Sequence, residues 1–319
     1  MKGRCAVGRD ERTPASRSAK VGKVAALAGL VALLATGCSG DEVLRFGWPV
    51  GVTKESEDMR VLWTWSVIAA LVVGVIVWGL IFWSVAFHRK KKTHGPGDLP
   101  RQFQYNVPLE LFCVVLPLVM VCVLFFFTAT TESKVLAEEP DPDVTVDVIA
   151  FQWNWEFDYP SAPKDANGQV IKTVGSSSEI PILVLPAGKR IQYNLRSADV
   201  IHSFWVPEFH FKRDVFPDPE KNNQDPSFQN TIDRTGAFVG RCAELCGTYH
   251  SGMNFEVRAL PADQFDRYIQ LRTQINPATG QPNTTAEALA ALNCGELCAP
   301  QATTTKPFNT DRTLRTQSG

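Results

Sequence analysis

Two long hydrophobic stretches dominate the first half of the chain. Residues 61–87 form a continuous apolar run, and a second run covers residues 109–129. Each is close to or above the roughly 20 residues that an α-helix needs to cross the hydrocarbon core of a bilayer. The first run carries tryptophans near its ends, as membrane-interface anchors do: Trp63, Trp65 and Trp83. The pattern predicts a hairpin of two transmembrane helices.

The segment between these runs is basic. His88-Arg89-Lys90-Lys91-Lys92 follows the first run directly. Short loops rich in Lys and Arg stay on the cytoplasmic side of a membrane. Residues 88–108 are therefore expected to form a cytoplasmic loop, and the chain after Glu132 is expected to lie outside the cell.

The pattern changes again over residues 143–262. Short runs rich in Val, Ile and Phe, several of them alternating, are separated by clusters of Pro, Gly, Asn and Asp. Such runs predict an all-β sandwich or barrel with antiparallel strands. Residues 263–319 are expected to form an amphipathic helix that ends the domain, followed by a polar tail.

The N-terminus resembles a targeting segment. A basic leader precedes the apolar residues 24–34, which are too few to span a bilayer comfortably. The run ends in Ala-Thr-Gly-Cys38, similar to a lipoprotein cleavage box, so residues 1–37 are predicted to be a signal peptide and Cys38 the lipidated residue. Ordinary signal cleavage and an uncleaved anchor remain alternatives. Residues 38–60 are expected to be an extended linker.

Composition narrows the classes of function. The chain has 319 residues and a formal net charge of −1. This balance argues against a nucleic-acid partner, and the length permits one moderate globular domain beside the membrane segments. The motif Cys-x-x-Cys-His is absent, so no covalently bound haem c is expected on this chain.

One short segment carries the chemistry. It runs Cys242-Ala-Glu-Leu-Cys246-Gly-Thr-Tyr-His250-Ser-Gly-Met253, and His202 precedes it. Thiolates, imidazoles and a thioether form a soft ligand set that suits copper far better than calcium or magnesium. A mononuclear blue-copper site needs only one Cys, whereas a second Cys on the same loop allows two thiolates to bridge two metal ions.

Other interpretations of this segment remain open. Two Cys and two His could hold a structural zinc ion, although Met253 would then have no role. The two cysteines could also form a disulfide in an oxidising compartment. The segment contains no nucleophile with an adjacent base, so a catalytic pocket is not expected.

The pattern C-x-E-x-C-x3-H-x2-M, with His-Ser-Phe-Trp-Val-Pro upstream, resembles the dinuclear copper (CuA) site of cytochrome c oxidase subunit 2. The two apolar spans and the segment Gln152-Trp153-Asn154-Trp155 follow the order of that family. The resemblance implies a cupredoxin-like Greek-key sandwich. It also implies six copper ligands: bridging Cys242 and Cys246, one imidazole each from His202 and His250, a weak Met253, and the backbone carbonyl of Glu244.

The resemblance assigns roles to further residues. Trp153, with Trp155, would receive electrons from cytochrome c, although aromatic residues of a β-domain are more often core. The carboxylate of Glu244 would help to bind Mg²⁺ at the contact with oxidase subunit 1, which must supply other ligands. Glu110 would lie at the entrance of a proton path, or it simply reaches the membrane interface.

The same family implies the setting of the protein. Expected partners are oxidase subunit 1, other oxidase subunits, a soluble or tethered cytochrome c and the membrane. The complex would be an aa3-type oxidase that passes electrons to haem a, reduces oxygen and pumps protons. It would lie in a bacterial cell membrane, with the C-terminal domain on the extracytoplasmic side.

Other functions remain compatible with parts of this sequence. The alternatives are a nitrous oxide reductase-like enzyme, a copper-free quinol oxidase subunit 2 and a membrane-tethered copper-delivery protein.

A second cysteine pair, Cys294-Gly-Glu-Leu-Cys298, is similar to the first, but no His or Met follows it at the right spacing. A disulfide is the simpler prediction there. His210, between two phenylalanines, is expected to be a packed or surface histidine.

Overall fold

The structure, a computed structural model, describes residues 40–89, 95, 97 and 102–307. The predicted signal peptide and Cys38 lie outside these residues. The chain divides after Trp48 into two units. The first unit contains the short helix α2 (Gly40–Arg45), and the second begins at Pro49. Helix α2 corrects the prediction of a fully extended linker over residues 38–60.

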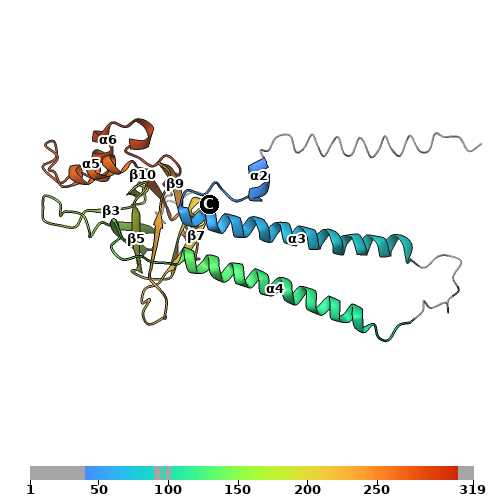
Figure 1. Cartoon of the computed structure of the whole chain (residues 1–319). Coiled ribbons are helices and arrows are strands. Elements are labelled where there is room, and N and C mark those ends of the chain that lie inside the picture. Colours follow the sequence, from blue (N-terminus) through green and yellow to red (C-terminus); the bar gives the residue numbers. More distant parts are fainter. Residues whose placement is uncertain (1–39, 90–94, 96, 98–101, 308–319) are drawn as a thin grey trace, which may run out of the picture. The chain divides into compact units, whose positions relative to one another are not determined.

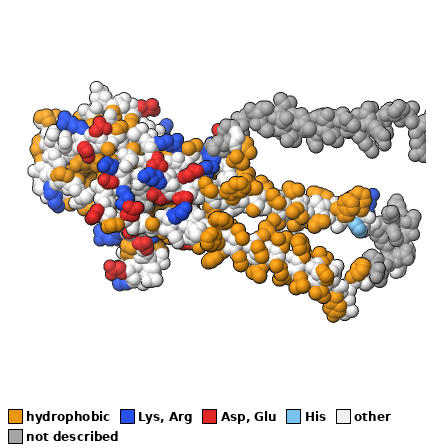
Figure 2. Space-filling model, in the orientation of Figure 1, with side chains coloured by type: hydrophobic (Ala, Val, Ile, Leu, Met, Phe, Trp, Pro, Cys, Tyr) orange, Lys and Arg blue, Asp and Glu red, His pale blue; other side chains and the backbone are white. Residues whose placement is uncertain are grey.

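Two long helices confirm the predicted hairpin (Figure 1). They are α3 (Lys54–Phe87) and α4 (Val107–Val135), and apolar side chains make up most of both. Both are long and apolar enough to cross a membrane. Figure 2 shows hydrophobic side chains covering these helices, whereas Lys, Arg, Asp and Glu gather over the strand domain.

Helix α3 begins earlier than the apolar pattern predicts. Thr53 Oγ1 accepts a hydrogen bond from Ser56 N at 3.1 Å, and Ser56 Oγ accepts one from Thr53 N at 3.2 Å. This reciprocal cap satisfies two backbone donors that a helix start leaves without partners. The cap lies ahead of the apolar run, so the first turns of α3 replace the end of the predicted linker.

Within the residues that the structure describes, ten strands form two five-stranded sheets (Figure 1). The first sheet has the order β3 (Lys172–Val174), β2 (Asn154–Asp158), β1 (Val144–Phe151), β5 (Arg190–Ser197) and β8 (Ser227–Thr231). The second has the order β4 (Ile182–Pro186), β10 (Asn254–Leu260), β9 (Gly236–Cys242), β6 (His202–Val206) and β7 (Phe211–Val215). The pairs β1–β5 and β4–β10 are parallel. The predicted all-β sandwich is confirmed, but its sheets are mixed, whereas the sequence pattern had indicated antiparallel strands.

Alternating side chains build the core between the sheets. In β1, every second residue is buried, from Val144 to Ala150, as period-2 geometry requires. Trp155 and Phe255 pack with ring centroids 5.1 Å apart, and Phe204 lies 4.8 Å from Phe255. A Cβ at Gly240 would approach the Phe255 ring to 2.1 Å. A side chain at that position of β9 would displace the aromatic core.

His210 connects the start of α3 to the strand domain. It follows the short helix η1 (Pro207–Phe209) with a φ of 54°, and its side chain is buried. Its Nδ1 lies 3.1 Å from Ser56 O and its Nε2 lies 2.9 Å from Pro49 O. Val52 N also donates to Glu208 O at 2.9 Å. Of the two expected placements, the structure shows the packed histidine.

The C-terminal region is more ordered than a polar tail. Helix α5 (Ala262–Arg272) is followed by α6 (Thr285–Leu292) and the short helix η3 (Gly295–Cys298). Cys294 and Cys298 form the predicted disulfide. Arg258 on β10, fully buried, donates to the carbonyls of Leu297 and Ala299 at 2.7 and 3.1 Å. This part of the chain is fixed on the sandwich.

Candidate metal centre

The sulfur and nitrogen ligands meet at one end of the second sheet. His202 is the first residue of β6 and Cys242 is the last residue of the neighbouring β9. These strands pair with Phe204 opposite Cys242. The chain then loops through Cys246 and the short helix η2 (His250–Gly252) before β10 begins after Met253. Antiparallel pairing therefore brings His202 beside a loop that is distant in sequence.

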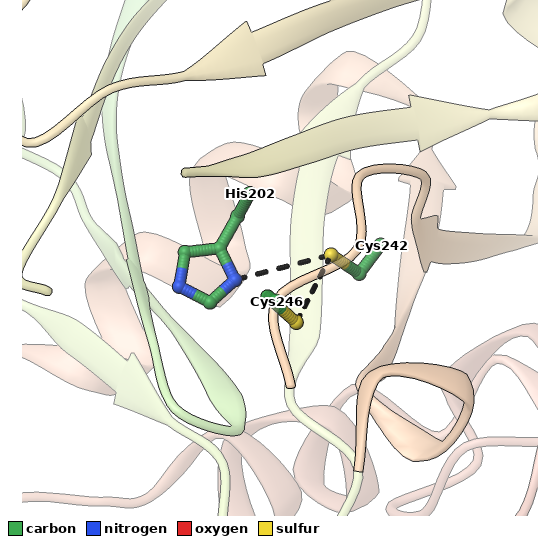
Figure 3. Close-up of side chains that lie close together, drawn as sticks. All are labelled: His202, Cys242 and Cys246. Carbon is green, nitrogen blue, oxygen red and sulfur yellow. Dashed lines mark hydrogen bonds between the residues drawn. The ribbon is translucent and has the colours of Figure 1, made fainter. Parts of the chain in front are cut away.

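The predicted ligand atoms converge (Figure 3). Cys242 Sγ lies 3.7 Å from Cys246 Sγ and 3.9 Å from His202 Nδ1. The liganding atoms of these three residues all lie within 4.8 Å of one another. Cys246 Sγ lies 3.6 Å from His250 Nδ1 and 3.8 Å from Met253 Sδ. Glu244 O lies 3.3 Å from Cys242 Sγ.

The centre is shielded from water except on one side. His202 is fully buried, and Cys242, Cys246 and Met253 are each less than 10% exposed. His250 is partly exposed. Leu245, between Glu244 and Cys246, is 78% exposed. The loop thus presents an apolar side chain outward while it holds its ligand atoms inward.

The two thiols differ strongly in acidity. The hydrogen bond from Cys246 and, further, that from His202 lower the pKa of Cys242 to about 3. The pKa of Cys246 is raised far above its usual value, because Cys246 serves as donor to Cys242 and is buried beside its negative charge. Thiolates, not thiols, are metal ligands. The pair alone therefore holds one negative charge readily, and a second requires cations between the sulfur atoms.

Asp199 fixes the orientation of His202. Its Oδ1 lies 2.8 Å from His202 Nε2, so Nε2–H donates to the carboxylate, and Nδ1 faces Cys242 Sγ, where it can bind a metal once it has released its proton. Burial lowers the pKa of His202, but the hydrogen bonds with Cys242 and Asp199 outweigh it and raise that pKa overall. Asp199 Oδ2 also accepts from Gln152 N at 2.6 Å.

This geometry decides between the interpretations left open by the sequence. A disulfide has sulfur atoms about 2.05 Å apart, whereas Cys242 and Cys246 are 3.7 Å apart and free. A structural zinc ion takes four ligands in a tetrahedron. Here four further donors, one of them a thioether, surround the two cysteine sulfur atoms, which makes six donors in all. The donor set fits copper, and the shared sulfur pair fits two ions.

The two predicted tryptophans have different environments. Trp153 is partly buried, donates from Nε1 to Cys246 O at 3.1 Å, and meets Tyr249 edge to face at 4.9 Å. Trp155 is fully buried and donates to Met253 O at 3.3 Å. A protein that delivers electrons cannot contact Trp155, because the Trp155 side chain is not exposed. Its expected surface role is corrected to a core role beneath the metal ligands.

A glycine makes the contact of Trp153 possible. Gly247 has a φ of +120°, and a Cβ there would lie 3.2 Å from the indole of Trp153. Gln152 Nε2 also donates to Cys246 O, at 2.8 Å. The backbone carbonyl of Cys246 therefore accepts two hydrogen bonds, one from Gln152 and one from Trp153.

The structure gives the positions of Glu110 and Glu244, but it does not test their predicted roles in a proton path and in Mg²⁺ binding. Glu110 lies in the first turn of α4, where its Oε1 accepts from Asn106 N at 3.0 Å. The side chain of Glu244 is partly exposed. Their roles in proton uptake and Mg²⁺ binding therefore stay predictions.

Asp199 and Gln152 are site residues that the sequence pattern missed. Asp199 precedes His202 by one short turn, so a carboxylate three residues before a ligand histidine was the available signal. Gln152 had a weaker signal, its place beside Trp153. Both act through contacts across the fold that no local pattern encodes.

Comparisons with known proteins agree with this centre. The family model described as "Cytochrome C oxidase subunit II, periplasmic domain" matches residues 144–260. "Probable cytochrome c oxidase subunit 2" of Nocardia farcinica (strain IFM 10152) is 47% identical over 340 residues, covering 90% of this chain and 87% of the relative. "Cytochrome c oxidase subunit 2" of Mycobacterium tuberculosis (strain ATCC 25618 / H37Rv) is 45% identical over 335 residues, covering 91% and 89%.

Among solved structures, the periplasmic domain of subunit II of cytochrome oxidase (CoxB) of Bradyrhizobium japonicum is 27% identical. It covers 41% of this chain and 94% of its own, with a TM-score of 0.34. The assignment to a family rests on the sequence relatives, which match nearly the whole chain. The chain belongs to the cytochrome c oxidase subunit 2 family, whose members are subunits of a haem–copper oxidoreductase complex.

Proposed function

We propose that this chain is the electron-input subunit of an aa3-type cytochrome c oxidase. It receives single electrons from a cytochrome c on the side of Trp153 and delivers them to haem a of subunit 1, for oxygen reduction coupled to proton pumping. One observation carries the proposal. Two thiols, two imidazoles, a thioether and a carbonyl converge at the end of one sheet. Each of these groups lies 3.3–3.9 Å from a cysteine sulfur.

The protein's own residues provide a rigid, water-poor ligand cage. Cys242, Cys246, His202, His250 and Met253 would hold a copper pair, which would supply a redox centre that shares a single unit of charge between two ions. His202 begins β6, Cys242 ends β9 and β10 begins directly after Met253, so the second sheet fixes both ends of the ligand loop. Asp199 holds the His202 ring, and buried Trp155 and Met253 keep solvent out. Such preorganisation lowers the structural change that each electron transfer requires.

Trp153 is the proposed contact for the electron donor. It is partly exposed, and its indole is one hydrogen bond from the backbone of a bridging cysteine. Glu156 and Asp158 lie on the strand that follows it. Their charges would attract a basic cytochrome, and such attraction mainly raises the association rate.

Other assignments extend the proposal to the complex. Glu244 would share Mg²⁺ with subunit 1, since one carboxylate cannot fill an octahedral oxygen shell. Glu110 would open a proton path, and Cys38 would carry a lipid in a bacterial cell membrane. The outer domain and the two apolar helices support a membrane-anchored protein with an extracytoplasmic C-terminal domain.

Replacement of one bridging sulfur tests the proposal. In the purified oxidase complex, Cys246→Ser should slow oxidation of reduced cytochrome c at least about 100-fold, because even outer-sphere ligand partners are worth about 10–100-fold. Stopped-flow absorbance of the cytochrome measures the rate. The control Cys113→Ser alters a thiol on α4, exposed in this chain and distant from the centre. An undiminished rate in Cys246→Ser would overturn the proposal.

A further inference from the structure

A groove between the two long helices has no role in the proposed electron path. Its volume is about 780 Å³, and α3 and α4 both line it. This size lies within the range of about 300–1,000 Å³ that small-molecule sites occupy. Hydrophobic side chains dominate the lining, among them Leu62, Val119 and Leu124.

The polar residues in the wall do not interrupt this apolar surface. Ser66 Oγ donates back to Leu62 O at 2.7 Å, within its own helix. Thr130 Oγ1 donates to Phe126 O and to Phe127 O, each at 3.0 Å. Because these hydroxyls are satisfied along their helices, the groove suits a hydrocarbon chain.

The groove covers only the outer part of the helices. It is lined from Asp58 to Ala69 on α3 and from Val119 to Lys134 on α4. At 1.5 Å per residue these stretches measure about 17 and 22 Å, close to one leaflet of a hydrocarbon core that is about 30 Å thick, with its headgroup layer. One acyl chain has this length, whereas a transmembrane helix of another subunit runs through both leaflets. The length therefore favours a lipid.

An ion pair stands at the mouth of the groove. Lys134 Nζ lies 3.7 Å from Asp58 Oδ1, and their side chains are 68% and 46% exposed. Trp65, 67% exposed, lies in the same wall, as aromatic residues do at the level of lipid headgroups. A cation and an anion side by side complement a zwitterionic headgroup: the lysine faces the phosphate and the aspartate faces the amine.

We propose that this groove binds one phospholipid with a zwitterionic amine headgroup, such as phosphatidylethanolamine. An acyl chain lies along Leu62, Ala69 and Val119, and the headgroup inserts between Lys134 and Asp58. The bound lipid fills the space between α3 and α4 in the outer leaflet, directly below the strand domain.

The groove can be blocked with a matched control. Ala69 and its neighbour Ala70 are both exposed in this chain, but only Ala69 lines the groove. Ala69→Trp should fill the groove, and Ala70→Trp adds the same side chain to the lipid-facing surface. The purified oxidase complex is placed in nanodiscs with phosphatidylethanolamine that carries a photoreactive acyl chain. Adducts are located by mass spectrometry of α3 and α4 peptides.

Adducts should concentrate on the groove residues of the parent, persist in Ala70→Trp and be lost in Ala69→Trp. Asp58→Asn with Lys134→Gln should lower adduct yield about fivefold, as expected for one headgroup charge contact. Phosphatidylglycerol should compete poorly, because it carries the phosphate but has no ammonium group to face Asp58. The proposal would be overturned by uniform adducts along both helices or by equal competition from phosphatidylglycerol. It would also be overturned if the parent showed no groove adducts and Ala69→Trp lost another subunit.

Discussion

Two cysteine thiols four positions apart have very different acidities. The hydrogen bonds that Cys246 and, to a smaller extent, His202 donate bring the pKa of Cys242 to about 3, while Cys246 resists deprotonation. The difference arises because the sulfur atoms share one proton at 3.7 Å. Positive metal ions between them would make the second thiolate favourable. The acidity of the pair thus follows directly from its spacing on the loop.

The two tryptophans beside the centre give a residue-level prediction. Trp153→Phe removes the indole donor to Cys246 O but keeps a ring beside Tyr249. Gln152 still donates to that carbonyl, so the loop should keep its shape. We expect copper content to stay normal and cytochrome c oxidation by the complex to slow about tenfold or more.

Trp155→Phe is the matched comparison. Trp155 is fully buried, so its replacement should cost about 1–3 kcal/mol of folding stability through lost packing. Thermal unfolding measures that loss. A greater effect on the initial docking of cytochrome c from Trp155→Phe than from Trp153→Phe would contradict the proposed contact.

Asp158 predicts a pH dependence of stability. Burial and the neighbouring Glu156 raise its pKa to about 6, and its Oδ1 is buried without a hydrogen-bond partner. Its unfolded value is about 3.9. Since the folded pKa is the higher one, its stabilising contribution is present below about pH 4 and is lost as pH rises through about 6.

Asp158→Asn should therefore raise the unfolding temperature at pH 8 and have little effect at pH 4. Thermal unfolding of the purified chain across this range measures the difference. Asp266→Asn, which changes an exposed carboxylate on α5 that does not contribute to the shift of Asp158, serves as a control for a general loss of surface charge. An Asp158→Asn variant that is less stable at pH 8 would refute the assignment.

Among elements, the last strand and the C-terminal segment depend on one buried ion pair. Glu256 and Arg258 on β10 are both fully buried and bonded to each other. Arg258 bonds the carbonyls of Leu297 and Ala299, and Glu256 Oε2 accepts from Thr303 N and Thr304 N at 2.7 Å. Backbone groups that have no strand partner are thus satisfied by two charged side chains.

Arg258→Met should release this segment. It leaves Glu256 buried without its cation, which typically costs about 3–5 kcal/mol. Urea unfolding measures the loss, and faster proteolysis between residues 294 and 305 reports the release. The double variant Glu256→Leu/Arg258→Met removes both charges and should recover part of the stability. A single variant as stable as the parent would show that the pair does not hold the segment.

The elements also show what sequence patterns can and cannot predict. Apolar runs and period-2 alternation predicted the helices and the strands, and the spacing of Cys242, Cys246, His250 and Met253 predicted a common centre. The pairing of β1 with β5 and of β4 with β10 depends on contacts between distant segments, which alternation does not specify. The apolar pattern does not reveal the start of α3, because polar residues, Thr53 and Ser56, form the cap there.

At the scale of the whole molecule, the account requires a fixed topology. The basic residues 88–92 predict that the loop between α3 and α4 is cytoplasmic, and the strand domain then lies outside. Single cysteines should report this. In intact cells, Ser177→Cys in the outer domain should gain labelling by a membrane-impermeant maleimide over the parent chain, and Gly97→Cys in the loop should gain it only after lysis. The reverse pattern would contradict the orientation.

The centre itself is tested most directly by copper loading of the purified chain, followed by metal analysis and electron paramagnetic resonance. Paired thiols at 3.7 Å, with two imidazoles, a thioether and a carbonyl around them, predict two coppers per chain. They also predict a hyperfine pattern from one unpaired electron shared equally by both nuclei. A single localised copper, or a chain that retains only zinc, would contradict the account.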